Sequence, residues 1–303
     1  MPSSVKSLHK ASPAAINMLR ADYYLWKAAR LSGGTDALQK AQTSVNAVLS
    51  AGYSLQANFA DVFDLSNENN SELILTFPYT VGENVEAGKS PNFFAYFLAP
   101  SSTTAQLANA GYTQDQVPTG SHAQYVTVTA DYGKFLLADP NDVRGAASVK
   151  VYDDTFLNNE VLITSIIVKF KGSWTNSTRV FENDVPVYRL AEAYMLKAEV
   201  ENALGNTASA ISALNVIAKR ARGVDNYYTG LSKEQITQAI IDESKMEFVS
   251  EGKQWWLYLR LNKEFEQIAT LVGRQSETNV TLWPVAQACI TSNSNITQTP
   301  GYN

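Results

Sequence analysis

Cysteine and histidine are nearly absent from this sequence. Its 303 residues include one cysteine, Cys289, and two histidines, His9 and His122. A single cysteine cannot form an internal disulfide, and neither histidine has a second ligand at the spacing that zinc sites use. The sequence also lacks a glycine-rich phosphate loop and a G-x-S-x-G motif. These absences argue against a metal protein and against several common classes of enzyme.

Basic charge and long apolar runs are also missing. The 24 basic residues are outnumbered by 29 acidic ones, so the net charge of -5 offers no basic field for nucleic acid. The longest apolar run, residues 161–170, is shorter than the roughly 20 residues that span a bilayer. The N-terminal sequence MPSSVKSLHKASPAA has neither an apolar signal core nor a cysteine that could carry a lipid. We therefore expect no export signal and no lipid anchor within this chain.

Helical periodicity begins near the N-terminus. Ser12 followed by Pro13 is typical of a helix start, and apolar residues then recur at three- and four-residue spacing up to Gly33. A second helix is expected from about Asp36 to just before Gly52. The two helices form a unit of tetratricopeptide size, about 34 residues.

The C-terminal half contains the longest helical pattern. Its first helix is expected to include Val187 in its apolar face and to end at Gly205. Thr207 is expected to cap a second helix, which ends at Gly223. Ser232 starts a third helix, and the glutamine three residues later completes a capping box. Three helices joined in this way should pack antiparallel, each against the next.

The two helical regions share a motif. Residues 21–28 (ADYYLWKA) align with residues 191–198 (AEAYMLKA), which keeps two alanines, the acid, the tyrosine and the lysine in register. Two helical pairs of one design indicate a helical scaffold with a second module inserted between them.

The residues between the helical pairs are rich in Ser, Thr, Asn, Gly and aromatic residues. Short strands are expected there at residues 72–77, 124–129 and 161–170, and loops at residues 82–90 and 176–184. The predicted fold class is therefore mainly α, with tetratricopeptide-like helical pairs and a loop-rich insertion that carries a few short β-strands.

We divide the chain into three parts that form one intertwined unit. The insertion is the candidate ligand-binding region, because loops on a rigid scaffold commonly carry binding sites. The parts are a first helical pair (1–55), the insertion (56–184), and a C-terminal helical scaffold with a closing segment (185–303).

Three carboxylates, Glu243, Glu247 and Glu251, are four residues apart on one expected helix face. They should repel one another unless cations neutralise them. We favour a structural role over a catalytic one, with cations supplied across helix contacts. The candidate cations are Arg189, Arg220 and Arg260.

Several motifs occur together along the chain: R-L-A-E-x-Y (189–194), L-N-x-I-x-x-R-A-R-G (214–223), E-x-x-x-E-F-x-x-E-G (243–252), N-S-E-L-I (70–74) and N-x-x-x-x-Q-x-P-G-Y (293–302). As a set they resemble the middle and C-terminal part of the SusD/RagB family, the surface lipoproteins of Bacteroidetes that capture nutrients. Two positions depart from the family pattern. Val143 replaces the proline of an Asp-Pro-Arg element, and Ser244 stands where the family usually has arginine, so one inter-helix ion pair is expected to be lost or replaced by Lys245.

The resemblance implies a function. Family members bind a polysaccharide or oligosaccharide at the bacterial outer-membrane surface without turning it over. They deliver it to a SusC-type TonB-dependent transporter, need no cofactor, and are tied to the membrane by a lipid anchor in an N-terminal part that this chain lacks. Two alternatives stay open. One is a tetratricopeptide-like protein-interaction module without glycan binding. The other is a glycoside hydrolase, whose two catalytic carboxylates are brought together by folding and need not be close in sequence.

Aromatic side chains are the candidate glycan contacts, because the apolar face of a sugar ring stacks on them while neighbouring amides bind its hydroxyls. Aromatic residues make up 11% of the chain. Trp174 is expected in a polar loop, where exposing a large ring is costly without a purpose. The candidate ligand-binding residues of the insertion are Trp174, Tyr79, Tyr96, Tyr112 and Asn92.

Overall fold

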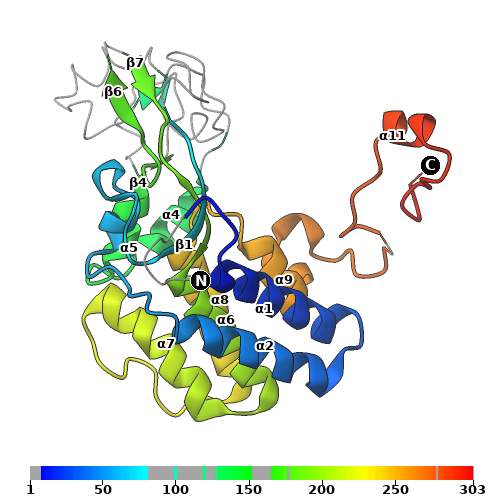
Figure 1. Ribbon diagram of the computed structural model, residues 1–303, viewed down its shortest axis with the longest axis horizontal. Coiled ribbons are helices and arrows are strands. Elements are labelled where there is room, and N and C mark those ends of the chain that lie inside the picture. Colours follow the sequence, from blue (N-terminus) through cyan, green and yellow to red (C-terminus); the bar gives the residue numbers. More distant parts are fainter. Residues whose placement is uncertain are drawn as a thin grey trace. The chain divides into compact units, whose positions relative to one another are not determined.

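The computed structural model describes residues 8–80, 99–100, 119–120, 126, 128–151, 165–175, 178–277 and 279–302. The chain packs as two compact units, Met1–Gln254 and Trp255–Asn303. The fold is mainly helical with a few short strands, as the sequence predicts (Figure 1). The three-part division at residues 55 and 184 stays a prediction.

The first helical pair has the predicted form. Helix α1 (Pro13–Arg30) begins after Ser12, whose hydroxyl oxygen accepts a hydrogen bond from the amide of Ala15 at 3.1 Å. Helix α2 (Gly34–Leu49) returns antiparallel to it. A side-chain cap and a first-turn proline both favour a helix start at this point.

The C-terminal helices are α6 (Leu190–Leu204), α7 (Thr207–Arg222) and α8 (Lys233–Glu247). The glycines that follow α6 and α7 are left-handed, and the capping box at the start of α8 is present, as predicted.

Two details of that prediction are wrong. The cap residue of α7 is Asn206, and Thr207 is the first helical residue. Val187 lies in a strand, β8 (Val185–Arg189), because this segment pairs with a strand from the insertion before α6 begins. A proline at position 186 also disfavours an earlier helix start, since it restricts the residue before it to extended backbone.

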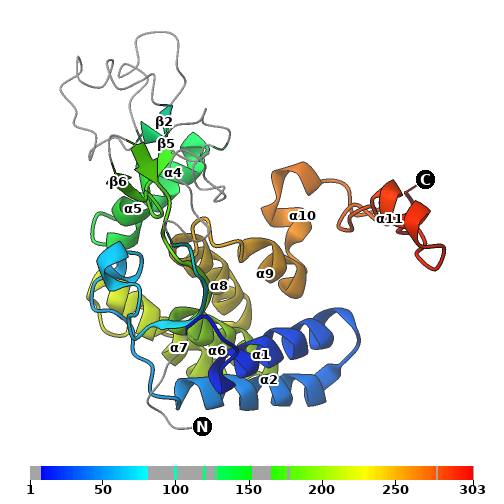
Figure 2. The same cartoon turned by 45° about the horizontal axis from the view of Figure 1, so that its top comes forward.

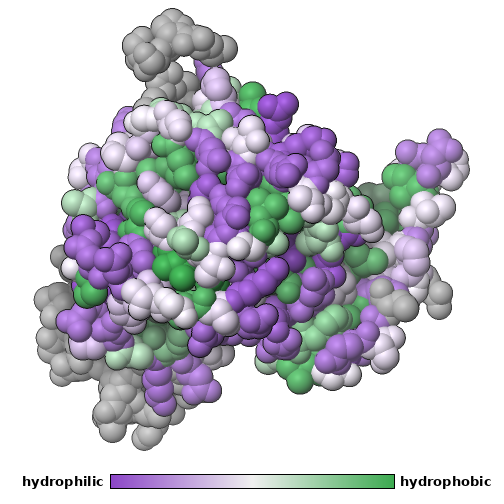
Figure 3. Space-filling view, turned by 90° about the horizontal axis from the view of Figure 1, so that it is seen from below, coloured by the Kyte–Doolittle hydropathy of each residue, from purple (hydrophilic) through white to green (hydrophobic). Residues whose placement is uncertain are grey.

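The two helical pairs stack although most of the insertion separates them in sequence. Helix α1 packs on α2, α2 on α6, and α6 on α7 and α8 (Figures 1 and 2). The shared motif places a fully buried alanine at equivalent positions, Ala21 in α1 and Ala191 in α6. On the face shown in Figure 3, hydrophilic and hydrophobic residues are interspersed. Within the described residues, no helix combines the length and apolarity needed to cross a membrane.

The insertion contains short elements. Its helical turns are η1 (Phe59–Val62), η2 (Leu65–Asn67), α4 (Ala130–Leu136) and α5 (Val143–Ser148). Its described strands are β1 (Leu73–Phe77), β2 (Ala99–Pro100), β3 (Thr119–Gly120), β4 (Val149–Val151), β5 (Ser165–Ile167), β6 (Ser173–Thr175) and β7 (Thr178–Val180). Strand β2 pairs with β3 in parallel; β4 with β5 and β6 with β7 are antiparallel.

The strands predicted for the insertion are only partly confirmed. The run at residues 72–77 is confirmed as β1, and the run at residues 161–170 contains β5. Most of the run at residues 124–129 lies outside the described residues, and its last two residues lead into α4 rather than forming a strand. The expected loop at residues 176–184 contains β7, because this segment folds back on β6 as a hairpin.

Strand β1 joins the insertion to the scaffold by pairing antiparallel with β8. Leu73 lies opposite Arg189, and the amide of Leu190 donates to the carbonyl of Glu72 at 2.8 Å. The pairing places the Glu72 side chain next to the Arg189 guanidinium at the start of α6.

Buried charges form one connected network where the insertion meets the scaffold. Its members are five cations and five carboxylates, so its formal charge is zero, and every member side chain is at most 9% exposed. They are Arg144, Lys169, Arg189, Arg220 and Arg222 with Glu72, Asp142, Glu243, Glu247 and Glu251.

Arg189 lies at the centre of this network. Its guanidinium makes five hydrogen bonds, the number of N–H donors that it carries. Four go to carboxylate oxygens of Glu72, Glu247 and Glu251 at 2.6 to 2.8 Å, and one goes to the Glu247 carbonyl at 2.9 Å. The ring of Phe248 faces the guanidinium carbon at 4.6 Å. All donors of a fully buried cation are thus satisfied.

Arg144 anchors α5 to α8. Its Nε and Nη2 donate to the two oxygens of Asp142 at 2.9 and 2.7 Å, while Nη1 reaches Glu243 at 2.8 Å and Glu247 at 3.1 Å. Asp142 also caps α5 by accepting from the amide of Arg144 at 3.1 Å. The sequence predicted that Arg189, Arg220 or Arg260 would neutralise the three carboxylates. Arg189 and Arg220 do so, as their ion pairs with Glu247 confirm. Arg260 lies in the second unit. The roles of Arg144, Arg222 and Lys169 were not predicted.

The positions that depart from the family pattern lie beside the network. Ser244 is buried in α8, and its carbonyl accepts from the Gln254 side chain at 3.1 Å. The ammonium of Lys245 faces the ring of Phe135 at 5.9 Å.

The second unit contains most of α9 (Gln254–Leu261), α10 (Glu264–Gln267), η6 (Ala269–Leu271) and α11 (Gln287–Ser292). Its closing segment is held by the Gln298 amide, which accepts from the Val285 N–H at 2.7 Å and donates to the Val285 carbonyl at 3.0 Å.

The network predicts a large loss of stability for Glu247→Gln. Burial raises the pKa of Glu247, but attraction to Arg220, Arg189 and Arg144 outweighs it and holds the pKa well below its ordinary value. Removing this charge leaves buried cations uncompensated, so the free energy of unfolding should fall by about 3 to 5 kcal/mol. Urea denaturation at pH 7 measures it. Glu234→Gln, at an exposed position of α8, should cost less than about 1 kcal/mol. Equal effects of the two variants would contradict the structural role.

The start of α5 predicts that Val143→Pro is tolerated or stabilising. Val143 is the first residue of α5 and is 47% exposed, and Asp142 before it is extended at φ -82°, ψ 105°. Proline fits this helix position and this preceding conformation, so the unfolded chain loses more freedom than the folded one. We expect a gain of about 0.4 to 1 kcal/mol by urea denaturation. Val143→Ala serves as the control for side-chain loss, and a Val143→Pro variant less stable than it would refute the prediction.

Glu192 predicts a pH dependence of stability. Burial raises the pKa of Glu192 to about 7, and nearby Asp22 adds to this, although Lys253 pairs with it at 2.8 Å. Between the ordinary pKa of 4.5 and about 7 the folded chain therefore holds a proton that the unfolded chain has released, so this group's contribution to stability falls as pH rises through that window. In Glu192→Gln this fall should disappear, a difference on the order of 3 kcal/mol between pH 4.5 and 8. Urea denaturation across that range measures it, and parallel curves for variant and parent would contradict it.

Candidate functional site

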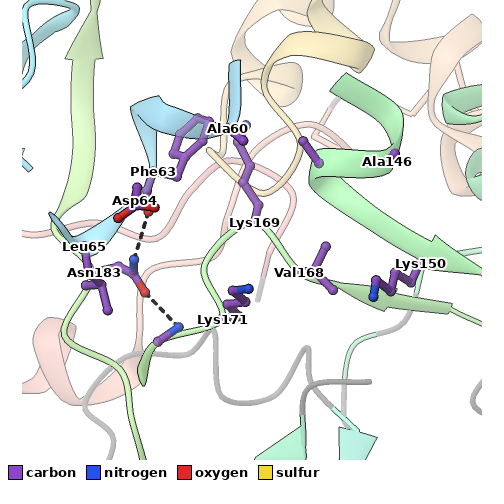
Figure 4. Close-up of a pocket in the computed structure, with 12 residues that line it drawn as sticks. Ala60, Phe63, Asp64, Leu65, Ala146, Lys150, Val168, Lys169, Lys171 and Asn183 are labelled. Atoms are coloured by element: carbon purple, nitrogen blue, oxygen red, sulfur yellow. Dashed lines mark hydrogen bonds between the residues drawn. The ribbon is translucent and has the colours of Figure 1, made fainter. Parts of the chain in front are cut away.

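A cavity of about 350 Å³ lies within the first unit, at the base of the insertion (Figure 4). Its walls come from the η1 and η2 turns, from the end of α5 with the start of β4, and from the segment after β5. The lining residues are Ala60, Phe63, Asp64, Leu65, Ala146, Ala147, Lys150, Val168, Lys169, Lys171, Gly172 and Asn183.

Asn183 ties two walls of the cavity together. Its Nδ2 donates to the Phe63 carbonyl at 3.2 Å, and its Oδ1 accepts from the Gly172 amide at 2.9 Å (Figure 4). Gly172 has φ +63°, and a Cβ there would lie 2.1 Å from the Val180 carbonyl oxygen. Only glycine fits such a position. Contacts of the backbone and of the Asn183 amide therefore shape this part of the cavity wall.

Lys169 connects the cavity to the buried network. Its ammonium donates to the Glu251 carboxylate at 2.5 Å and to the Glu247 carbonyl at 2.9 Å, and it lies 4.2 Å from the centre of the Phe63 ring. Burial lowers the pKa of Lys169 to about 8, although Glu251 opposes this shift. This lysine lines the cavity, but its ammonium group is hydrogen-bonded to Glu247 and Glu251 of the buried network.

Asp64 is the one carboxylate among the described residues of the lining. Its Oδ1 accepts from the Ser66 amide at 2.7 Å and from the Ser66 hydroxyl at 2.6 Å, and these bonds lower the pKa of Asp64.

Of the two histidines, His9 lies in the described part of the chain. His9 lies 2.9 Å from Asp184, whose other oxygen accepts from the Tyr79 amide at 3.2 Å. His122 lies outside the described residues. No group of three or more metal-ligating side chains occurs among the residues that the structure describes.

The predicted ligand-binding residues are only partly placed. Trp174 lies in β6 opposite Arg179, in a strand and not in the expected loop, two residues after Gly172 of the cavity lining. Tyr79 is partly buried, and it is not one of the lining residues. Tyr96, Tyr112 and Asn92 lie outside the described residues. Whether these residues contact a ligand stays a prediction.

Sequence reasoning missed the cavity itself. Its described polar lining comes from Asp64, Lys150, Lys169, Lys171 and Asn183, and the rest of the described lining from Phe63 and from small and aliphatic residues. The only local signal was the K-F-K-G run at residues 169–172, where lysines alternate before a glycine. Such a run is common in surface strands, so it does not by itself indicate a site.

Comparisons with known proteins agree with the motifs. A family model described as "SusD family" matches residues 102–302. A curated relative, SusD-like protein P25 of Formosa agariphila, is 28% identical over 223 residues, which is 66% of this chain and 41% of the relative.

Solved structures share the fold. A SusD superfamily protein from Bacteroides fragilis has a TM-score of 0.77 at 23% identity, with 98% of this chain and 66% of that chain covered. A laminarin-binding SusD-like protein has a TM-score of 0.71 at 21% identity, with 98% and 64% covered. The chain thus spans about two thirds of these structures and less than half of the curated relative. Because the family model covers most of the chain, this chain belongs to the SusD family.

Proposed function

We propose that this chain binds a glycan without turning it over. Membership of the SusD family and the cavity at the base of the insertion support this, and the cavity is the observation that carries it. Its volume is at the lower end of the roughly 300 to 1,000 Å³ typical of ligand sites. Phe63, Leu65 and Val168 offer apolar surface to a sugar ring.

We further propose that the bound glycan passes to a SusC-type TonB-dependent transporter at the bacterial outer surface. This step rests on the family alone. The scaffold would then supply the rigid support, and the insertion would supply the ligand contacts, including Trp174 of β6.

The alternative is a protein-interaction module built on the stacked helical pairs. Deleting the insertion cannot distinguish the two functions, because Asp142, Arg144 and Lys169 belong to the buried network, and their loss would unfold the scaffold. A point change that fills the cavity is the cleaner experiment.

Ala146→Trp should abolish glycan binding without unfolding the protein. Ala146 is exposed at the end of α5 and lines the cavity, so an indole there occupies space that a sugar would need. We expect affinity for a glycan bound by the parent chain to fall at least about tenfold, measured by calorimetry after screening a glycan array.

Ala208→Trp, at an exposed position of α7, is the matched control and should bind like the parent. Unchanged binding by Ala146→Trp would place the glycan elsewhere. Protein-partner binding in the absence of any glycan binding would favour the interaction module, and release of reducing sugar from a bound glycan would favour a hydrolase.

A further inference from the structure

One face of α1 carries large apolar side chains that are open to solvent. Ile16, Leu19 and Tyr23 are 47%, 60% and 51% exposed. Because they are three and four residues apart, they lie within about 60° of one another around the helix. Apolar residues scattered singly over a surface need no explanation, whereas a contiguous group marks an interaction site. We call these three residues the α1 patch.

The motif shared by the two helical pairs shows what the equivalent face of α6 does. In the alignment of residues 21–28 with 191–198, Tyr23 is equivalent to Ala193. Ala193 is fully buried, in one core cluster with residues of α1 and α2 such as Ala41. Leu196 and Val200, which follow on the same face of α6, are buried in that cluster as well. The first helical pair therefore covers the face of α6 that α1 leaves exposed.

The position of α1 in the stack makes this exposure informative. Helix α1 comes first in the row α1, α2, α6 and α7, in which each helix packs on the next. The end of such a stack is normally made soluble by a polar outer face. The α1 patch is apolar instead, so the face is suited to one more helix, which would lie on α1 as α2 lies on α6.

Charge indicates the chemistry of that helix. Arg20, which is exposed, and Lys27, which is partly exposed, lie on the same side of α1 as the patch. The one acid of α1 is Asp22, and its carboxylate accepts a hydrogen bond from the Tyr188 hydroxyl of β8 at 3.0 Å. An apolar stripe beside two basic residues complements a helix whose own apolar stripe has acidic neighbours.

We propose that the α1 patch binds an amphipathic partner helix that carries acidic residues beside its apolar stripe. The partner helix packs on α1 as α2 packs on α6. This surface belongs to the helical scaffold, and no residue of α1 is among the described residues of the cavity lining. The proposal is therefore independent of glycan binding.

Two synthetic peptides of residues 33–50, each held helical by a cross-link on its polar side, serve as probes. The acidic peptide carries Lys40→Glu, Gln42→Glu and Ala47→Glu, and the basic peptide carries Gln42→Lys and Ala47→Lys. Both keep the buried apolar residues of α2, which are Ala37, Ala41, Val45 and Val48. Fluorescence anisotropy with the full chain should show the acidic peptide binding at least about tenfold more tightly than the basic one.

Leu19→Gln/Tyr23→Gln removes the apolar contact without changing the net charge, and it should weaken binding of the acidic peptide at least about tenfold. Arg20→Gln/Lys27→Gln should instead lose most of the preference for the acidic peptide, and the salt dependence of binding should become shallower. Ala208→Gln/Ser212→Gln, at exposed positions of α7, is the matched control and should bind like the parent. Thermal unfolding should show that all variants are folded.

Binding of neither peptide, equal affinity for both, or equal losses in the α1 and α7 variants would overturn the proposal. Self-association of the parent chain in sedimentation velocity, abolished by Leu19→Gln/Tyr23→Gln, would also overturn it, because the occupant would then be a second copy of the chain. Glycan binding by this variant, measured by calorimetry, should match the parent, so failure of this proposal and failure of the proposed function are distinguishable.

Discussion

The compensation of buried charge is the constraint on which this structure depends. Five cations and five carboxylates lie where the insertion meets the helical scaffold, and each is buried against a partner of opposite sign. An isolated charge at such a depth would be costly, and only closely placed counter-charges with satisfied hydrogen bonds offset that cost. The network therefore fixes where β1, α5, β8, α7 and α8 meet. It also sets the position of the cavity, because Lys169 belongs to both.

The helices were predictable because their signals are local. Ser12 with Pro13, the left-handed Gly205 and Gly223, and the Ser232 capping box each act within one turn of the chain. The start of α6 was not predictable, since β8 exists through pairing with β1, over a hundred residues away in sequence. The spacing of Glu243, Glu247 and Glu251 indicated that cations must neutralise them. Identifying all of these cations required the fold, although nine of the ten network residues, all but Lys169, lie in the motifs that carry the family resemblance.

The cavity was harder to predict than the scaffold for a physical reason. Sequence reasoning looked for rings exposed in loops, and it selected Trp174, which the structure places in a hairpin strand. The cavity arises instead from the closure of two turns by Asn183 and from a glycine that admits a close backbone contact. Neither feature has a periodic or compositional signature. A cavity that forms where segments distant in sequence pack together can be located only in the three-dimensional structure.

The long sequence separations within the network bear on how the chain is made. Arg189 contacts Glu72 from 117 residues away, and Arg144 contacts Glu247 from 103 residues away. During synthesis at about 5 to 20 residues per second, Arg144 of the insertion emerges before its partners Glu243 and Glu247 in α8 exist, by roughly 5 to 20 seconds. The insertion consequently cannot bury this charge as it leaves the ribosome, and its final packing awaits α8. In this unit the last helix of the scaffold completes the folding of segments made long before it.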